Sequence, residues 1–284
     1  MPEPLTDATP TCFRHPDRET YVSCVRCGRH ACGDCMRPAS VGQQCVECVR
    51  EGGRTTRAAR TAFGGRPAAG AVVTWTLVAI NVVVFLIALA QPSTIYNLAM
   101  ASTDVASGHW YQLITSAFEV PTTSGLGFMD ILFNMWALIY LGPALERMLG
   151  HVRYLTLYLL SALGGAVFYY WVADPAGPGA AGASGAIFGL FGAWFVVARR
   201  LRLDTRGIVT LIVINLAFSF IYRSTIAWQD HIGGLITGAV VAAAYGYAPQ
   251  KGRTLTHVAA SVAVLAILVV ATMLRTPQIP LPPH

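Results

Sequence analysis

The stretch GAAGASGAIFGLFGAW, residues 179–194, places closely spaced glycines around a single hydroxyl side chain, that of Ser184. A second apolar segment, DHIGGLITG at residues 230–238, has the same character. The glycines that recur near helical spacing are Gly182, Gly185 and Gly189 in the first segment and Gly233, Gly234 and Gly238 in the second. Small residues on facing sides let two membrane helices approach backbone to backbone. We therefore expect these two segments to pack against each other.

Near its start the first segment carries a single hydroxyl, that of Ser184, and the second a single imidazole, that of His231. A hydroxyl needs a base to become a nucleophile, and imidazole is the usual one near neutral pH. A helix that begins at Ser184 would also present free N–H groups and a positive dipole end, which stabilise an oxyanion. The pattern predicts a Ser184–His231 pair; the alternative is a packing motif whose serine bonds only the backbone.

The composition places these segments in a membrane. Of the 284 residues, 54% are hydrophobic and only 12% are charged, against roughly a quarter charged in soluble domains. A span needs about 20 apolar residues. The candidate spans lie near 71–90, 130–149, 154–173, 184–200, 207–222, 229–247 and 255–273, the fifth being short.

The basic residues predict the orientation of these spans. They gather in segments that fall on one side of the membrane: Arg50–Arg66, Arg147 and Arg153, Arg199 to Arg206, and Lys251 and Arg253. By the positive-inside rule this side is cytoplasmic. We therefore attribute the net charge of +6 to the orientation of the spans in the membrane and not to nucleic-acid binding. We expect a multi-pass protein of a bacterial plasma membrane, with its amino terminus inside and its carboxyl terminus outside.

All seven cysteines lie between residues 12 and 48, where they form ligand pairs with two-residue spacers. The pairs are Cys12 with His15, Cys24 with Cys27, Cys32 with Cys35, and Cys45 with Cys48. One tight turn can supply two ligands to a tetrahedral zinc ion, so eight ligands suit two structural zinc ions. A cross-brace resembling a B-box would share the first and third pairs on one ion and the second and fourth on the other.

Two alternatives to the cross-brace stay open. Sequential pairs could share each ion, or the cysteines could form disulfides, although an odd cysteine count and a cytoplasmic location argue against the second. His30 is expected at the surface and not among the ligands. We divide this region into a zinc-binding module at 1–50, held together by metal in place of a core, and a basic Gly/Arg linker at 51–70.

Three motifs in order resemble the rhomboid intramembrane serine proteases: ILFNMWALIYLGPALERMLG at 131–150, GASGAIFGLFG at 182–192 and DHIGGLITG at 230–238. The resemblance covers roughly residues 71–248. It implies an all-α membrane protein with a rhomboid-like six-helix core at 71–248. A seventh transmembrane helix and a Pro-rich tail would follow at 249–284, and the small zinc-binding domain would precede the core.

The resemblance also implies roles for single residues. Ser184 matches the nucleophile, His231 the general base, and Asn134 the side-chain donor of the oxyanion hole. Phe188 matches an aromatic ring that packs on the imidazole. Gly182 and Asp130 are grouped with Phe188 as residues that bind or orient the substrate. The family uses a dyad, so no carboxylate partner is expected.

This chain departs from the family pattern in three places. Asp130 stands where a histidine usually helps to bind the oxyanion, Gln112 follows Trp110-Tyr111 where an arginine is usual, and Phe118-Glu119-Val120 replaces a Phe-x-His element. A carboxylate beside a developing oxyanion repels it unless it is protonated or turned away. Activity is therefore expected to be low or dependent on pH.

The interpretation is an intramembrane serine endopeptidase that cleaves membrane-anchored substrates near the outer bilayer boundary. Catalysis needs no cofactor, and the zinc module would regulate the enzyme or dock a protein partner. The first alternative is an inactive rhomboid-like protein that binds membrane clients. The second is a transporter or channel, for which we find neither paired intramembrane charges nor a repeated half.

Overall fold

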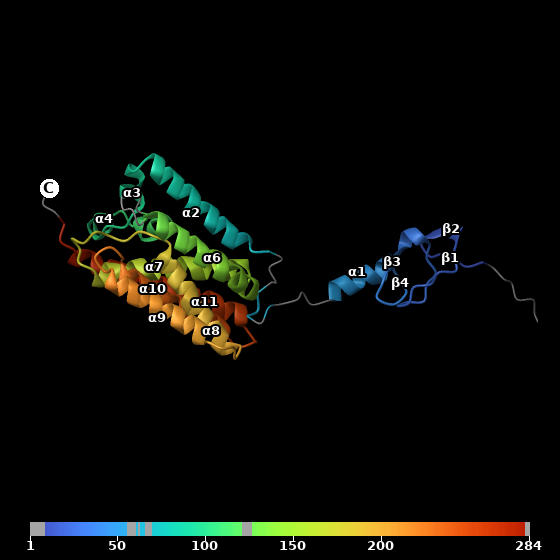
Figure 1. The fold of residues 1–284 in the computed structure, drawn as a ribbon. Coiled ribbons are helices and arrows are strands. Elements are labelled where there is room, and N and C mark those ends of the chain that lie inside the picture. Colours follow the sequence, from blue (N-terminus) through green and yellow to red (C-terminus); the bar gives the residue numbers. More distant parts are fainter. Residues whose placement is uncertain (1–8, 56–60, 62, 66–69, 121–126, 282–284) are drawn as a thin grey trace, which may run out of the picture. The chain divides into compact units, whose positions relative to one another are not determined.

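The structure, a computed structural model of the chain, describes residues 9–55, 61, 63–65, 70–120 and 127–281. It divides into two compact units, Met1–Ala59 and Arg60–His284, and each is described by itself below. Figure 1 shows the elements of both units. Much of the predicted linker, 56–60, 62 and 66–69, lies outside the described residues.

The amino-terminal unit is built from two small antiparallel hairpins and one helix. Its elements are β1 (Thr11–Cys12), β2 (His15–Glu19), the 3-10 turn η1 (Gly33–Cys35), β3 (Met36–Pro38), β4 (Gln43–Cys45) and α1 (Val46–Thr55). Strand β1 pairs with β2 and β3 with β4. The buried residues are mostly cysteines, joined by Ala31 and Met36. So little apolar surface cannot offset the entropy of ordering such a chain.

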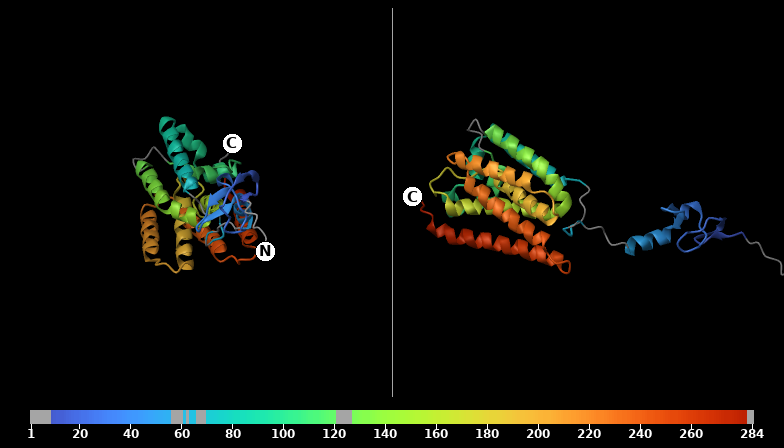
Figure 2. Two further views of the ribbon diagram at one scale, coloured as in Figure 1. Left: turned by 90° about the vertical axis from the view of Figure 1, so that its right-hand side faces the viewer. Right: turned by 60° about the horizontal axis from the view of Figure 1, so that its bottom comes forward.

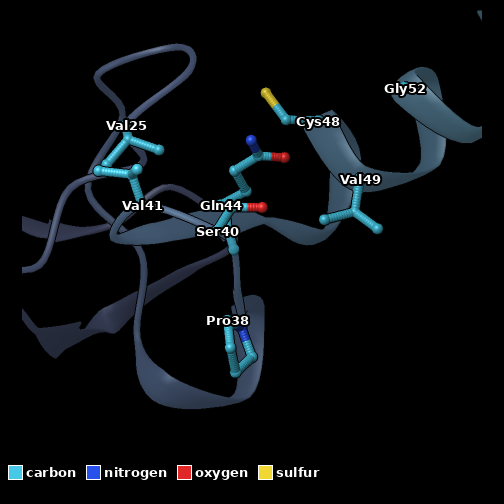
Figure 3. A pocket seen from close by; sticks show the side chains of 9 residues that line it. Val25, Pro38, Ser40, Val41, Gln44, Cys48, Val49 and Gly52 are labelled. Atoms are coloured by element: carbon cyan, nitrogen blue, oxygen red, sulfur yellow. The ribbon is translucent and has the colours of Figure 1, made fainter.

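One side of this unit carries an open groove of about 730 Å³. Its walls come from the β3–β4 hairpin, helix α1 and the loop around Val25 (Figure 3). Val25 and Val41 are exposed in it, and Val49 presents another apolar side chain from α1. The groove is therefore apolar at several points, although its floor includes Gln44 and Cys48.

The second unit is helical. Each predicted span corresponds to one of its long helices: α2 (Val72–Ala90), α6 (Gly127–Leu149), α7 (His151–Val172), α8 (Ser184–Arg200), α9 (Arg206–Ile221), α10 (Trp228–Gly246) and α11 (Arg253–Arg275). Helices α2, α6, α7 and α11 are long and apolar enough to cross a membrane by themselves. Helix α9 is apolar but shorter, with 16 residues. The expectation of an all-α membrane bundle after a small Cys/His-rich unit is confirmed.

Helices α7, α8 and α10 form the centre of the bundle, and their contacts are made by backbone. A Cβ at Gly234 would collide with the carbonyl oxygen of Gly185, and one at Gly238 with the carbonyl of Gly189. Gly233 likewise lies against the backbone of Gly164 on α7. Only glycine permits helices to come this close, so the glycine spacing in the sequence translates directly into the packing of α8 on α10.

The other helices surround this centre (Figure 2). Helix α2 packs on α6, and the buried carboxylate of Glu146 accepts hydrogen bonds from the backbone N–H groups of Val73 and Thr74, both at 2.9 Å. A carboxylate at this place satisfies two otherwise unpaired donors of the α2 amino terminus. Helix α11 lies along α7 and α10 and is held there by a bond from Arg153 to His257 at 2.7 Å.

Helix α9 is the most loosely attached of the long helices. Among its described side chains only Ile208 and Ser219 are buried, while Val213, Ile214 and Phe218 are more than half exposed. The exposed side chains suit contact with lipid, because no other element of the described chain covers them. Most side chains of α9 would therefore contact lipid.

The segment between α2 and α6 is more ordered than a plain loop. It contains the short helices α3 (Ser93–Leu98), α4 (Ser102–Ala106) and α5 (Gln112–Thr115) and the 3-10 turn η2 (Ser116–Phe118). Its backbone joins the chain that leads into α8, through a bridge between Met100 and Ala180 and a 2.8 Å bond from the Gly182 N–H to the Ser116 carbonyl. This segment therefore fixes the approach to Ser184.

Candidate active site

Ser184 and His231 meet at the amino-terminal ends of their two helices. Ser184 is the first residue of α8, and His231 lies in the first turn of α10. The Ser184 Oγ lies 2.8 Å from the His231 Nε2, which is hydrogen-bond distance. His231 is buried, with 6% of its surface exposed. Because Gly234, one turn beyond His231, lies on the backbone of Gly185, the glycines keep the two side chains within reach.

The imidazole is held from two further directions. The ring of Phe188 stacks on it, with centroids 4.2 Å apart and an angle of 11° between the planes. On its other nitrogen, His231 Nδ1 lies 2.7 Å from the hydroxyl oxygen of Ser219 on α9. Ring plane and ring rotation are therefore both restrained.

Asn134 and Asp130 lie one turn apart on α6 and are bonded to each other. The Asn134 Nδ2 donates to the Asp130 Oδ1 at 3.0 Å. Asn134 is buried and Asp130 is half-buried. One of the two N–H groups of the Asn134 amide is thus engaged by a carboxylate, which leaves the second for another acceptor.

Gly182 separates this carboxylate from the nucleophile. Its φ of +126° is in a region that favours glycine. A Cβ at this position would lie 3.4 Å from the Asp130 Oδ2 and 3.5 Å from the Ser184 Oγ. The carboxylate and the hydroxyl therefore approach the same face of Gly182.

The other two departures from the family pattern lie in the segment before α6. Gln112 is buried, with its Oε1 accepting from the Ala101 N–H at 3.2 Å and its Nε2 donating to Asp104 at 3.3 Å. Glu119 is completely buried. Burial, together with repulsion from Asp130, raises the pKa of Glu119 to about 7. The charge of Asp130 thus acts on Glu119, and this repulsion adds to burial in favouring the protonated form of Glu119.

The predicted metal ligands come together in two groups of four, separate from the serine and histidine. One group is Cys12, His15, Cys32 and Cys35, and the other is Cys24, Cys27, Cys45 and Cys48. Within each group the ligand atoms all lie within 4.8 Å of one another. These are the groups of the cross-brace arrangement, not of sequential pairing. His30 is partly buried and belongs to neither group.

The distances in these groups fit a tetrahedral ion better than disulfide bonds. A tetrahedron with metal–sulfur bonds of about 2.3 Å and metal–nitrogen bonds of about 2.0 Å has edges of roughly 3.5–3.8 Å. The His15 Nδ1 lies 3.4 Å from the Cys32 Sγ and 3.5 Å from the Cys35 Sγ, and the Cys27 and Cys45 sulfurs are 3.8 Å apart. A disulfide needs about 2.05 Å. Both groups can therefore hold a metal ion.

The ionisation of the thiols supports the same conclusion. Burial opposes ionisation, yet hydrogen bonds from backbone N–H groups lower the pKa of Cys12 and Cys24 to about 6 each. Burial and the neighbouring cysteine side chains raise the pKa of Cys35 to about 11 and that of Cys48 to about 12. A bound cation would relieve this repulsion and keep all the thiols ionised.

Sequence reasoning missed two residues beside the dyad. Ser219 lies in the apolar run Phe218-Ser219-Phe220 and gave no signal, because serines in membrane helices commonly bond only their own backbone. Asp230 precedes His231, and its carboxylate lies against the backbone at Gly165 and Gly185. A carboxylate next to His231 in sequence was a visible signal, although spacing alone could not tell which way it pointed.

The comparisons with known proteins concern the family of the helical unit. Residues 107–248, half of the chain, match the profile described as the rhomboid domain. The chain is 35% identical over 172 residues to rhomboid protease GluP of Bacillus subtilis (strain 168), which covers 58% of this chain and 32% of that protein. It is 36% identical over 148 residues to putative rhomboid protease YdcA of the same organism, covering 50% of this chain and 68% of the relative.

The match thus spans about a third of the first relative and about two thirds of the second. It includes α6, α7, α8, α9 and α10, and with them the bonded Ser184 and His231. The resemblance drawn from the three motifs is confirmed, and this chain belongs to the rhomboid family.

Proposed function

We propose that this chain is an intramembrane serine endopeptidase that uses Ser184 and His231 as a catalytic dyad. The single observation that carries the proposal is the 2.8 Å contact between the Ser184 Oγ and the His231 Nε2. It joins a nucleophile to its base at the amino terminus of a helix, where the first backbone N–H groups have no partner within the helix itself. Membership of the rhomboid family, and the names of both relatives as proteases, support the same reaction class.

In the proposed reaction, His231 Nε2 takes the hydroxyl proton while the Ser184 Oγ attacks the carbonyl carbon of the scissile bond. Backbone N–H groups at the start of α8 and the remaining N–H of Asn134 stabilise the oxyanion. The imidazolium then gives its proton to the leaving amine. Water, activated by the same imidazole, hydrolyses the acyl-enzyme. Phe188 keeps the ring in the plane that serves both proton transfers.

The substrates in this proposal are membrane-anchored proteins cut near the outer bilayer boundary. Ser184 and His231 both lie at the ends of their helices that, by the distribution of basic residues, face away from the cytoplasm. A peptide bond inside a helix is hidden by its own hydrogen bonding, so segments with helix-weakening glycine at the site should be cleaved best. The same orientation places the amino terminus inside and the carboxyl terminus outside.

We also propose that the two groups of cysteine and histidine ligands bind two structural zinc ions. Zinc prefers tetrahedral sulfur and nitrogen ligands, and these groups provide four each. The ligands would then replace the missing apolar core of this unit. Its role would be to regulate the protease or to dock a protein partner, because no ligand belongs to the serine and histidine site.

The test is the cleavage of a model transmembrane substrate by the purified protein in micelles or vesicles. Wild type is expected to cut the substrate and to react with a fluorophosphonate probe at Ser184. The Ser184→Ala variant should do neither, and His231→Ala should lose labelling because the hydroxyl has no base. A matched control, Ser161→Ala, removes another buried hydroxyl that bonds only the Leu157 carbonyl. Undiminished cleavage by Ser184→Ala would reject Ser184 as the nucleophile.

One observation favours a second candidate, a rhomboid-like protein that binds membrane clients without cutting them. Asp130 occupies an N–H of the proposed oxyanion donor, Asn134. A charged carboxylate there opposes an oxyanion. If wild type neither cleaves nor labels, while a transmembrane client is still retained on the immobilised protein, this candidate becomes the better account.

A further inference from the structure

The His231 imidazole has two nitrogens, and each must carry the correct proton for the proposed reaction. Nε2 has to accept the Ser184 proton, so it must be unprotonated in the resting state. Nδ1 must then carry the hydrogen of the neutral ring. In a serine protease triad a carboxylate enforces this tautomer, and its loss leaves a misprotonated ring and a slow enzyme. A dyad without a carboxylate needs another means.

Ser219 on α9 is placed to provide it. Its Oγ lies 2.7 Å from the His231 Nδ1 and 2.7 Å from the backbone carbonyl oxygen of Asn215. A carbonyl oxygen can only accept, so the one hydroxyl proton of Ser219 is committed to Asn215. Towards His231 the Ser219 oxygen can therefore only accept. The hydrogen in that bond must belong to Nδ1, which leaves Nε2 free for Ser184.

The hydrogen bonds then run in a single direction. The Ser184 hydroxyl donates to His231 Nε2, His231 Nδ1–H donates to the Ser219 oxygen, and the Ser219 hydroxyl donates to the Asn215 carbonyl. Reversing any of these bonds would leave two hydrogens, or none, between a pair of atoms. The chain ends in a helix backbone, which cannot change its polarity.

The burial of Ser219 indicates that this contact is not incidental. Ser219 is 2% exposed, although α9 buries only Ile208 besides it among its described side chains. The neighbouring Phe218 and Phe220 are each more than half exposed. The face of α9 that carries Ser219 is thus the part of the helix that reaches the dyad.

We infer that Ser219 is a positioning residue that selects the Nδ1–H tautomer of His231 and so keeps Nε2 ready to act as a base. This inference rests on the proposed function, because it assigns Ser219 to the same dyad. The group that orients His231 is then a neutral hydroxyl on a separate helix, where a triad has a carboxylate.

The experiment compares three variants of the full chain on one transmembrane substrate. Ser219→Ala should lower kcat roughly tenfold, the rate equivalent of one buried neutral hydrogen bond. KM should be unchanged, because Ser219 is buried and bonds the ring nitrogen that does not contact Ser184. Ser219→Thr should recover most of the rate, since a threonine hydroxyl makes the same bond to the carbonyl four residues earlier. Ser161→Ala, which removes a backbone-bonded hydroxyl elsewhere in the bundle, should match wild type.

A spectroscopic measurement tests the tautomer without relying on activity. In protein labelled with ¹⁵N-histidine, the His231 signals, assigned by their absence in His231→Gln, should show a protonated Nδ1 and an unprotonated Nε2. Ser219→Ala should move them toward a mixture of tautomers, and Ser219→Thr should restore them. A wild-type ring protonated on Nε2, or an unchanged kcat in Ser219→Ala, would overturn the inference. A wild type that cleaves nothing and reacts with no probe contradicts the proposed function instead, and the nitrogen signals still decide the tautomer.

Discussion

At the scale of single residues, the charge of Asp130 bears on how well the proposed dyad can work. Its carboxylate accepts a hydrogen bond from the Asn134 amide. It also approaches the face of Gly182 that the Ser184 hydroxyl approaches. Bound in this way it orients the amide, but a negative charge there also opposes the oxyanion that the amide should stabilise. The same contact therefore positions the donor and weakens its effect.

We predict that Asp130→Asn and Asp130→His raise kcat/KM, the first by removing the charge and the second by adding a neutral or cationic donor. Asn134→Ala should lower transition-state stabilisation by about 2–4 kcal/mol if Asn134 is an oxyanion donor. The measurement is cleavage of one transmembrane substrate across a range of pH.

The matched control is Asp204→Asn, which neutralises an exposed carboxylate that caps only the Arg206 N–H. Its rate should equal that of wild type. Equal rates and identical pH profiles for wild type, Asp130→Asn and Asp130→His would mean that the Asp130 charge does not reach the oxyanion.

At the scale of the elements, the glycines of α8 and α10 decide whether the dyad can form. Gly238 lies on the Gly189 backbone about two turns beyond His231, so its substitution reports on packing and not on the proposed chemistry. Gly207, near the start of α9, has open space where a Cβ would be. The two positions differ in their surroundings but undergo the same chemical change on substitution.

Gly238→Ala should therefore reduce the free energy of unfolding by roughly 1–3 kcal/mol or more, because two helix backbones must separate to admit one methyl group. Gly207→Ala should be neutral or slightly stabilising, since alanine favours helix more than glycine does. Denaturant unfolding in micelles compares the two variants. A Gly238→Ala protein as stable as wild type would show that the α8–α10 contact is looser than the backbone distances indicate.

The elements were largely predictable from the sequence, and the reasons are local. Long apolar runs predicted the seven long helices. The glycine spacing at 182–189 and 233–238 predicted that α8 and α10 pack closely against each other. What could not be predicted is long-range pairing that leaves no periodic signal. The Glu146 carboxylate bonds the start of α2 from over 70 residues away, and Ser219 reaches His231 from an apolar helix. Single polar residues in apolar runs have many possible partners.

At the scale of the molecule, the chain joins two units with different sources of stability. The membrane unit buries an extended apolar core, whereas the buried residues of the amino-terminal unit are mainly its cysteines. The cross-brace grouping was predicted from the order of the pairs and its resemblance to a B-box, but the sequence left sequential pairing open because both arrangements satisfy the same spacers. Only the folded distances separate them.

We predict that the fragment 1–55 binds close to two zinc ions and unfolds when a chelator removes them. Elemental analysis of protein purified under reducing conditions gives the stoichiometry, and circular dichroism follows the unfolding. Cys35→Ser should lose about one ion, while His30→Ala, outside both groups, should keep both. Protein without metal that keeps its fold would reject the structural role. A truncated chain beginning near residue 60 should still cleave substrate.

The unequal lengths of the helices also have a consequence for the surrounding lipid. At about 1.5 Å per residue, the 16 residues of α9 reach roughly 24 Å, whereas the 23 residues of α6 and of α11 reach about 35 Å. The hydrocarbon layer is about 30 Å thick. A helix shorter than this layer thins the bilayer beside it, whereas a longer helix tilts or thickens the bilayer. We therefore expect the bilayer to differ in thickness around the protein, and lipids of different tail length to distribute unequally around it.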